Sequence, residues 1–379
     1  MKKFFISTTI PLTLGFFKGH LKFLSEYFEV CAISSKPEEL ESFGRQEGVR
    51  VHCIPMERPI ALLKDIVSLF RFILFFLREK PDVVHGNTPK ASMLSMVAAW
   101  MTRVPVRIYM CHGLRYQGTS GLMRKLLILM ERLSCACATR VICVSKGVRE
   151  TFAEDGICSL KKSVVLGYGT ATGIDIEYFN PIEVEKNVLR KELGIPAEDF
   201  VFIFVGRIVT DKGVNELVTA FERLASEKEH VHLVLVGEEE MEQNPITDET
   251  RLHIVQNSRI YSIGKRKDVR PYLTDANAGV LPSYREGLGM VILETNAMGV
   301  PMISTDIIGC NEIIFPGLNG DIVAPRDVDA LYLKMREWVE NPDKLKKMST
   351  YCRGLVETRF ERKMVWQNCL NEYLRLAGE

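Results

Sequence analysis

Short apolar runs alternate with longer amphipathic segments along almost the whole of this 379-residue chain. This alternation predicts parallel α/β architecture, because a strand, a helix and a second strand in succession normally place both strands in one parallel sheet. We expect strands at the following places: 4–7, 30–34, 51–54, 83–85, 107–111, 141–144, 164–166, 201–205, 232–236, 259–262, 278–281, 301–304 and 320–323.

Helices are predicted between these strands, and the chain is long enough for two domains of ordinary size. In the first half the helices are expected over 61–79, 90–101, 122–138 and 146–154. The glycine-rich stretch 167–173 breaks the periodicity, so we expect the linker there. The predicted parts are an N-terminal domain, a C-terminal domain and a last helix, with the bounds 1–170, 171–360 and 361–379.

Composition excludes several classes of protein. Apolar residues make up 46% and charged residues 26% of the chain, which is typical of a globular protein. A net charge of +1 argues against a dedicated nucleic-acid binder, which needs a basic excess. Ten cysteines without a C-x-x-C pair fit reduced thiols in a cytosolic protein, and fit neither a disulfide framework nor a zinc site.

The N-terminus has some features of a signal peptide, with basic residues before an apolar run. Pro11, Gly15 and Lys18 interrupt that run, and no small-x-small cleavage site follows. We favour the alternative, a buried first strand from Lys3 to Ser7.

The segment 282–301 holds two carboxylates, Glu286 and Glu294, separated by seven residues. A glycine-rich turn follows Glu286, where the strand 278–281 gives way to a helix. Amide groups at a helix N-terminus point outward unpaired and favour an anion. Glu294, about two turns into the helix, is placed to accept hydrogen bonds from hydroxyls such as those of a ribose. A nucleotide-sugar site is predicted, with the amides of Gly287, Leu288, Gly289 and Met290 as the anion ligands. The alternative is two solvated glutamates beside a loop.

Two cations follow the buried strand 201–205. Arg207 and Lys212 are costly to place at the carboxyl end of such a strand unless an anion meets them. A diphosphate is the natural partner, because arginine chelates two oxygens and lysine supplies a point charge. The alternative is an ordinary solvated loop.

These two segments, 206–213 and 282–301, resemble the signatures of the retaining glycosyltransferases of family 4, the glycosyl transferases group 1. The resemblance covers nearly the whole chain. It implies the GT-B fold, with two Rossmann-like domains facing a cleft and a C-terminal helix that crosses back to the N-terminal domain. It also implies that Arg207 and Lys212 bind the donor diphosphate and stabilise the departing nucleotide, while Glu286 holds hydroxyls of the sugar.

The same resemblance gives roles to His112 and Gly15. The His112-Gly113 pair matches the family's His-Gly, which implies that His112 contacts the transferred sugar and stabilises charge; a core histidine is the alternative. Gly15 matches the family's glycine in the first loop, where a side chain would block phosphate and acceptor. The family's glycine doublet is absent here, and Gly19 is the other candidate.

The remaining site residues also follow from the resemblance. Asn87 and Lys90 lie in a loop that corresponds to the acceptor side, although simple helix capping by Asn87 or Thr88 is an alternative. The segment of Gly264, Lys265 and Arg266 corresponds to the one that packs along the nucleoside base. Lys265 and Arg266 as plain solvent charges are the alternative there.

No metal is required by this chemistry. Asp175 and Glu177 have the D-x-D spacing of the metal motif in the other glycosyltransferase fold. That motif ends a strand inside one nucleotide-binding domain, whereas this pair lies in the predicted linker. We therefore expect no metal site.

The segment 60–80 is unusually apolar for a surface helix. Lys64, Asp65 and Arg71 interrupt it, so no uninterrupted apolar run of about 18 residues exists to span a bilayer. It either packs on the sheet alone or also enters a membrane surface, and 123–130 adds a second basic and apolar face. Interfacial contact would suit a lipid-linked acceptor.

The resemblance therefore implies a retaining glycosyltransferase without a cofactor. It would move a hexose or N-acetylhexosamine from a UDP-sugar to a polyprenyl-diphosphate-linked saccharide in the synthesis of cell-surface polysaccharide. Its place would be the cytoplasmic face of the membrane. The alternatives are a nucleotide-sugar epimerase on the same fold and a non-catalytic nucleotide-sugar-binding protein.

Overall fold

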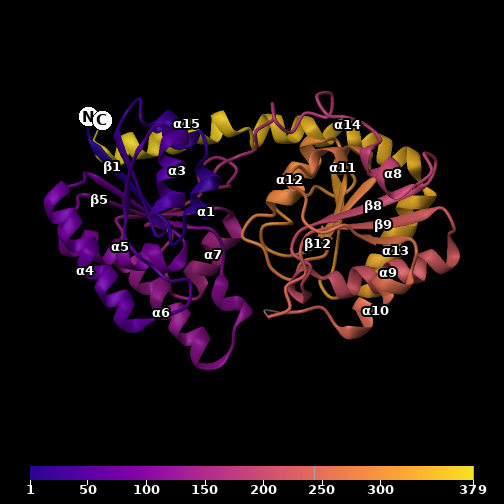
Figure 1. The fold of residues 1–379 in the computed structure, drawn as a ribbon, viewed down its shortest axis with the longest axis horizontal. Helices are drawn as coiled ribbons and strands as arrows, with labels where there is room; N and C mark the ends of the chain where they lie inside the picture. The colour runs from indigo at the N-terminus through magenta and orange to yellow at the C-terminus, as the bar shows by residue number, and fades with distance from the viewer. Residues whose placement is uncertain (243, 379) are drawn as a thin grey trace. The chain divides into compact units, whose positions relative to one another are not determined.

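The computed structural model describes residues 1–242 and 244–378; Gln243 and Glu379, the last residue of the predicted segment 361–379, lie outside it. The chain forms two compact units. The first contains Met1–Gly173 and the segment from Lys363 onwards, and the second contains Ile174–Arg362. Each unit has its own parallel sheet with helices on both faces (Figure 1).

The sheet of the first unit has the strand order β3-β2-β1-β4-β5-β6-β7, and every pair is parallel. Its central strands are buried on both faces, as expected for a parallel sheet covered by helices. The strands are β1 (Lys3–Ser7), β2 (Glu29–Ser34), β3 (Arg50–Cys53), β4 (Val83–Asn87), β5 (Val106–Cys111), β6 (Arg140–Cys143) and β7 (Ser163–Val164).

The helices of the first unit lie between these strands in the chain. They are α1 (Pro11–Leu14), α2 (His20–Leu24), α3 (Pro37–Glu47), α4 (Leu62–Glu79), α5 (Pro89–Met101), α6 (Gly121–Cys137) and α7 (Lys146–Glu154), with 3-10 turns η1 (Gly15–Phe17) and η2 (Arg115–Gly118). The predicted helices in this half are confirmed, whereas the helices α1 to α3 were not among those predicted. No helix in the described part of the chain is long and apolar enough to cross a membrane.

The second unit repeats the plan with six parallel strands in the order β10-β9-β8-β11-β12-β13. The strands are β8 (Phe200–Val205), β9 (Val231–Val236), β10 (Ile260–Ser262), β11 (Ala278–Leu281), β12 (Met302–Thr305) and β13 (Gly320–Val323). The helices are α8 (Val188–Leu193), α9 (Val214–Glu227), α10 (Asp248–Gln256), α11 (Arg270–Asp275), α12 (Met290–Ala297), α13 (Val328–Glu340) and α14 (Pro342–Arg359), with the 3-10 turn η3 (Thr210–Lys212).

The last helix, α15 (Arg362–Ala377), packs on the first unit and confirms the predicted return of the C-terminal helix. The Tyr373 ring lies 5.1 Å from the ring of Phe4 on β1. Glu372 accepts a hydrogen bond of 2.8 Å from Arg140 on β6. Because both contacts reach the central sheet, the last helix is part of this unit's fold.

The strand order reverses once in each sheet, next to β1 in the first and next to β8 in the second. Ligands of open α/β sheets bind outside the carboxyl ends of the strands at such a switch point. In the second unit the loop after β8 passes closely under the loop after β11. Gly213, the N-cap residue of α9, has φ of +70° there, and a Cβ at this position would lie 2.0 Å from the carbonyl oxygen of Pro282.

This contact predicts a measurable difference between two glycines. Gly213→Ala should lower the free energy of unfolding by about 2 kcal/mol or more, because it combines left-handed backbone with a backbone clash. Gly354→Ala, inside α14 with open space around its Cβ, should raise the free energy by roughly 0.5–1 kcal/mol. Urea unfolding of both variants checks the pair, and equal effects would contradict the packing described.

Candidate functional site

The two motifs of the second unit meet in one ion pair. Lys212 Nζ lies 2.5 Å from Glu286 Oε1, although the two residues are 74 positions apart in the chain. The Ser283 hydroxyl donates to the same carboxylate oxygen at 2.9 Å. Both charged groups are half-buried at the carboxyl ends of the neighbouring strands β8 and β11. The structure thus brings together a cation and a carboxylate that were predicted separately.

Further bonds fix the two loops to each other. The Tyr284 amide donates to the Asp211 carbonyl oxygen at 2.9 Å. Arg285 forms an ion pair with Asp211, and the Tyr284 hydroxyl donates to Glu216 on α9 at 2.5 Å. Such cross-links hold the Lys212–Glu286 pair in a defined place before any ligand arrives.

The side chain of Arg207 is exposed to solvent. It is 54% exposed, and its guanidinium lies 2.7 Å from the carboxylate of Glu240, in the loop after β9. An exposed pair of this kind contributes little to stability, so the guanidinium is available to a stronger anion. No described contact joins Arg207 to Lys212.

The glycine-rich turn after Glu286 offers fewer amides than the sequence predicted. The Gly289 amide donates to the Gly309 carbonyl oxygen at 3.1 Å, and the Met290 amide to that of Leu288 at 2.8 Å. These two amides are engaged because the turn folds back before α12 begins. Among the described residues, the amides of Gly287 and Leu288 have no hydrogen-bond acceptor and remain for an anion.

Glu294 is a half-buried carboxylate on α12 without a hydrogen-bond partner in the described part of the chain. Burial raises its pKa to about 7. Because α12 begins at Met290, Glu294 stands only slightly more than one turn into the helix, where two turns were predicted. An unpartnered carboxylate in this setting is suited to hydroxyl donors from a ligand.

One of the two cations in the segment after β10 is already paired within the protein. Gly264 has φ of +68° and open space where a Cβ would lie. Lys265 is exposed. Arg266 is paired with Glu192 on α8, and its guanidinium lies 5.5 Å from the centre of the Tyr272 ring. Of the two cations predicted here, Arg266 is held by the protein and Lys265 is exposed.

In the first unit a buried hydrogen-bonded chain ends at His112. His112 Nε2 lies 3.1 Å from Asn87 Oδ1, and Asn87 Nδ2 lies 2.8 Å from His85 Nδ1. His85 Nε2 is 3.1 Å from the Tyr373 hydroxyl on α15. With the amide oriented this way, His112 carries its proton on Nε2 and keeps Nδ1 as an acceptor.

Burial lowers the pKa of His112 to about 4 and that of His85 to about 3. Both rings are therefore neutral near pH 7. A neutral imidazole can hydrogen-bond to a sugar hydroxyl, but it brings no positive charge. The role expected for His112, contact with the transferred sugar and stabilisation of charge, stays a prediction, and a neutral ring would serve it through hydrogen bonds.

The structure uses both predicted acceptor residues internally. Asn87 is fully buried and serves His112 and His85. Lys90 is 6% exposed and forms an ion pair of 2.7 Å with Asp65 on α4. Both side chains are thus engaged within the protein. The N-cap residue of α5 is Thr88, the second residue of the capping alternative, and its side chain makes no capping hydrogen bond.

The two glycines of the first loop differ in what they require. Gly15 has φ of −56°, and a Cβ there would meet nothing within 4 Å. Gly19 has φ of +79°, and a Cβ there would lie 2.9 Å from the Trp366 ring on α15. Packing alone explains glycine at position 19. The protein leaves the space at position 15 open, so that prediction still stands.

Sequence reasoning missed Ser283, His85 and Tyr373 as parts of these sites. Ser283 lies within the motif 282–287, three residues before Glu286, so its contact with Glu286 could have been predicted from the sequence. The His85–Tyr373 contact joins residues 288 positions apart, and no pattern in the sequence announces it.

Two family models match the chain. Residues 185–354 match "Glycosyl transferases group 1" and residues 26–169 match "Glycosyl transferase 4-like domain". The chain is 32% identical over 374 residues to the capsular polysaccharide biosynthesis glycosyltransferase CapM of Staphylococcus aureus, which covers 98% of this chain and 97% of that protein. It is 27% identical to the UDP-Gal:alpha-D-GlcNAc-diphosphoundecaprenol alpha-1,3-galactosyltransferase of Escherichia coli, over 89% of this chain and 86% of that one.

Solved structures share the fold. Anabaena HepE in complex with UDP superposes with a TM-score of 0.80 at 19% identity, covering 98% of this chain and 99% of that one. The same protein in complex with UDP-glucose gives 0.79 at 19% identity, with the same coverage. At this identity the likeness concerns the fold, and it confirms the predicted GT-B architecture.

The buried chain to Tyr373 predicts an unusual titration for His112. Its ring should stay neutral down to about pH 4 in imidazole NMR spectra. Asn87→Asp places a carboxylate beside Nε2 and should raise this pKa toward or above the ordinary value of about 6.5. A wild-type His112 that titrates near 6.5 would contradict the burial of its ring.

Proposed function

The chain belongs to the group 1 glycosyltransferases, and from this we propose that it transfers a hexose or N-acetylhexosamine from a UDP-sugar, with retention, to a polyprenyl-diphosphate-linked saccharide. The observation that carries the proposal is the Lys212–Glu286 pair at the switch point of the second unit. In this proposal Lys212 is the cation that meets the diphosphate, and Glu286 beside it accepts from hydroxyls of the sugar.

We assign the departing charge to this unit's cations and amides. Negative charge grows on the diphosphate as the bond to the sugar breaks, and preorganised donors stabilise that charge. Lys212, Arg207 and the amides of Gly287 and Leu288 would supply them. Glu286, now bonded to Lys212, would accept from the sugar hydroxyls once the diphosphate engages the lysine. Glu294 would accept from the ribose.

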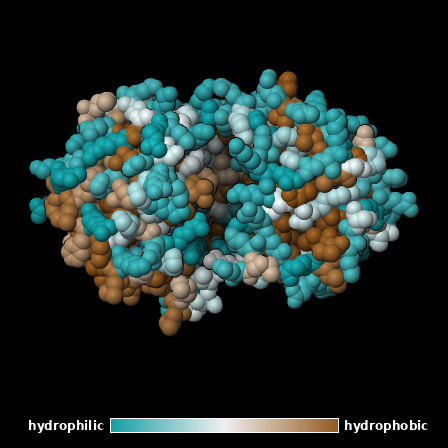
Figure 2. Space-filling model, in the orientation of Figure 1, coloured by the Kyte–Doolittle hydropathy of each residue, from teal (hydrophilic) through white to brown (hydrophobic). Residues whose placement is uncertain are grey.

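The acceptor class rests on the relatives and on the surface of the first unit. The E. coli relative is named for a diphosphoundecaprenol acceptor, and so is a Campylobacter jejuni relative that is 28% identical over 78% of this chain. Figure 2 shows apolar residues gathered over α4 and α6. Basic residues such as Lys64, Arg71 and Arg124 accompany them, so we propose peripheral contact with the cytoplasmic face of a membrane.

A panel of radiolabelled nucleotide sugars tests the proposal. UDP- and GDP-sugars are incubated with the protein and a polyprenyl-diphosphate-linked sugar, and label in the lipid fraction from a UDP-sugar is the expected result. Lys212→Ala should reduce kcat/KM about a hundred- to thousandfold, because it removes one preorganised cation.

Lys228→Ala is the matched control, since Lys228 pairs with Glu340 at the surface. It should leave transfer unchanged. An isomerised donor would indicate an epimerase, and an unaltered donor across the whole panel would indicate a binding protein; both outcomes refute the proposal.

The raised pKa of Glu294 predicts how donor binding depends on pH. The free carboxyl has a pKa of about 7, and only its ionised form accepts two ribose hydroxyls well. Donor binding therefore favours loss of the proton, and affinity should fall roughly tenfold between pH 8 and pH 6. Calorimetric titration with UDP measures this.

Glu294→Gln cannot ionise and should bind UDP more weakly, with most of this pH dependence removed. A pH profile that the substitution leaves unchanged would show that another group controls it.

A further inference from the structure

The loop after β11, which carries Ser283 and Glu286, is held from the side of β12 as well as from the side of β8. β12 pairs with β11 in parallel register, with Ser304 opposite Leu281. The Ser304 hydroxyl donates to the Leu281 carbonyl oxygen at 2.7 Å. The hydroxyl of Thr305, the last residue of β12, donates to the Ser283 carbonyl oxygen at 2.5 Å. Two neighbouring hydroxyls thus fix the end of β11 and the start of its loop.

The bond from Thr305 is buried. The exposed fraction is 0% for Ser283 and 1% for Thr305. Within the residues that the structure describes, no backbone amide donates to the Ser283 carbonyl oxygen, so the Thr305 hydroxyl is the donor on which this oxygen depends. Because a buried carbonyl group without a donor is costly, this bond favours one orientation of the Ser283 peptide.

Ser283 reaches the charged pair through its side chain. Its hydroxyl donates to Glu286 Oε1 at 2.9 Å, and Lys212 Nζ lies 2.5 Å from the same oxygen. Because the hydroxyl is only one bond away from Cα, a rotation of the Ser283 backbone changes the direction in which it donates. A chain of contacts therefore runs from Thr305 through Ser283 to the carboxylate of Glu286.

The loop after β12 also supports the glycine-rich turn. Gly309 has φ of +81°, and a Cβ there would lie 2.6 Å from the Gly287 carbonyl oxygen. The Gly309 carbonyl oxygen accepts from the Gly289 amide at 3.1 Å. The Asp306 amide donates to the Val323 carbonyl oxygen on β13 at 2.8 Å, which fixes this loop to the sheet. The turn is thus packed against a loop that is itself anchored.

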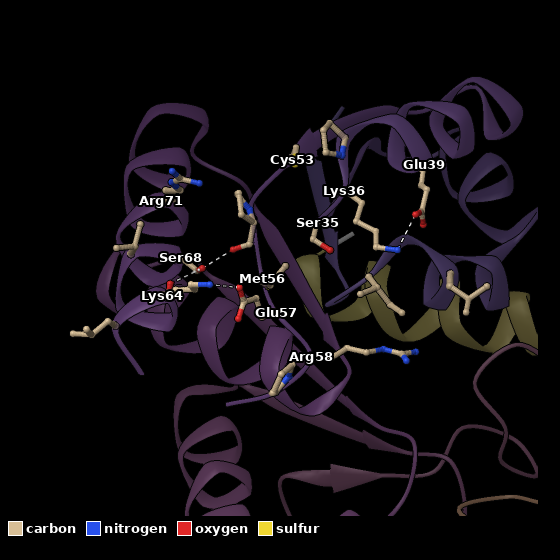
Figure 3. Close-up of a pocket in the computed structure, with 17 residues that line it drawn as sticks. Ser35, Lys36, Glu39, Cys53, Met56, Glu57, Arg58, Lys64, Ser68 and Arg71 are labelled. Atoms are coloured by element: carbon tan, nitrogen blue, oxygen red, sulfur yellow. Dashed lines mark hydrogen bonds and ion pairs between the residues drawn. The ribbon is translucent and has the colours of Figure 1, made fainter. Parts of the chain in front are cut away.

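The first unit contains the same kind of bond at the end of β2, beside its basic pocket. The Ser34 hydroxyl donates to the Thr8 carbonyl oxygen at 3.1 Å, and the Ser35 hydroxyl donates to that of Thr9 at 2.7 Å. The pocket has a volume of about 980 Å³ and lies against the first half of α4, with Ser35 labelled in its wall (Figure 3). Its basic side chains are Lys36, Arg58, Lys64 and Arg71.

The two units differ in what the tied residues do. The side chains of Thr8 and Thr9 bond to hydroxyls and to a carbonyl oxygen, which are uncharged groups. The side chain of Ser283 bonds to a carboxylate. Both sets of bonds fix neighbouring strand ends, and the bond from Thr305 in addition leads to a charged side chain.

We propose that Thr305 is a positioning residue of the donor site: its hydroxyl orients Ser283, and through Ser283 the carboxylate of Glu286. The inference rests on the proposed function, in which Glu286 accepts from hydroxyls of the sugar. Thr305 itself touches no substrate group. Its effect concerns the sugar half of the donor, because Lys212 meets the diphosphate from the other loop.

Donor kinetics test the assignment. Thr305→Val removes the hydroxyl at nearly the same volume, and kcat/KM for the UDP-sugar should fall about ten- to hundredfold, as expected for a misplaced carboxylate. The Kd of UDP should stay within about twofold, because UDP lacks the sugar that Glu286 binds. Thr305→Ser, which keeps the hydroxyl, should retain kcat/KM within about threefold of the wild type.

Ser304→Ala is the matched control. It removes the neighbouring hydroxyl and its bond to Leu281, a residue with an apolar side chain. Ser304→Ala and Thr305→Val should each lower Tm by roughly 2–4 °C, but only Thr305→Val should lower kcat/KM. An equal loss of kcat/KM in both variants, or none in Thr305→Val, would show a role in folding alone and overturn the proposal.

A second variant tests the next contact in the chain. Ser283→Ala leaves the bond from Thr305 to the main chain in place and removes the hydroxyl that bonds to Glu286. It should lower kcat/KM by a similar factor, and the double variant with Thr305→Val should lose no more than about twofold beyond the larger single effect. Losses that multiply would show two independent effects and contradict the chain of contacts.

A binding measurement separates this failure from that of the proposed function. UDP, UDP-glucose and UDP-N-acetylglucosamine are titrated calorimetrically, and the Kd of UDP divided by that of the tighter UDP-sugar measures what the sugar adds. This ratio should fall in Thr305→Val and stay unchanged in Ser304→Ala. A protein that binds a UDP-sugar with this dependence but transfers none would refute the transferase proposal and leave the role of Thr305 standing. A ratio that Thr305→Val leaves unchanged would overturn that role.

Discussion

The contact between Lys212 and Glu286 depends on the strand order of the second unit. β8 and β11 are neighbours only because the chain adds β9 and β10 on one side of β8 and then returns to its other side. This reversal leaves the loops after β8 and β11 at one switch point. Gly213 allows them to touch, and the bonds of Tyr284 and Arg285 to the β8 loop hold them there. The charges of the proposed donor site are thus placed by the strand order first and by side-chain contacts second.

In the first unit a buried hydrogen-bonded chain, and not a contact between two loops, positions the side chain of interest. Its key imidazole, His112, is oriented by a buried polar chain that runs through Asn87 and His85 to Tyr373 on the last helix. Buried polar groups are costly unless satisfied, so this chain ties the geometry of His112 to the docking of α15. The same sheet edge carries the basic pocket beside α4.

The sequence predicted the parallel architecture and the strands of the described chain, because most of them are buried and form continuous apolar runs; β3, which is only partly buried, is the exception. It also located Lys212 and Glu286 at strand ends, but their contact required the sheet order. The helix α3 was not predicted, although Pro37 at its start and Gly48 just past its end are typical of helix termini. The burial of Lys90 was unpredictable, because its partner Asp65 belongs to another helix and neither residue falls in a motif. The pocket cations come from three separate segments, which only the fold brings together.

We propose above all that the switch point of the second unit binds a diphosphate. A crystal structure of the protein with UDP measures this most directly. We expect diphosphate oxygens within hydrogen-bond distance of Lys212 Nζ and of the Gly287 and Leu288 amides, and ribose hydroxyls on Glu294. A nucleotide bound elsewhere, with Lys212 still paired only to Glu286, would contradict the account.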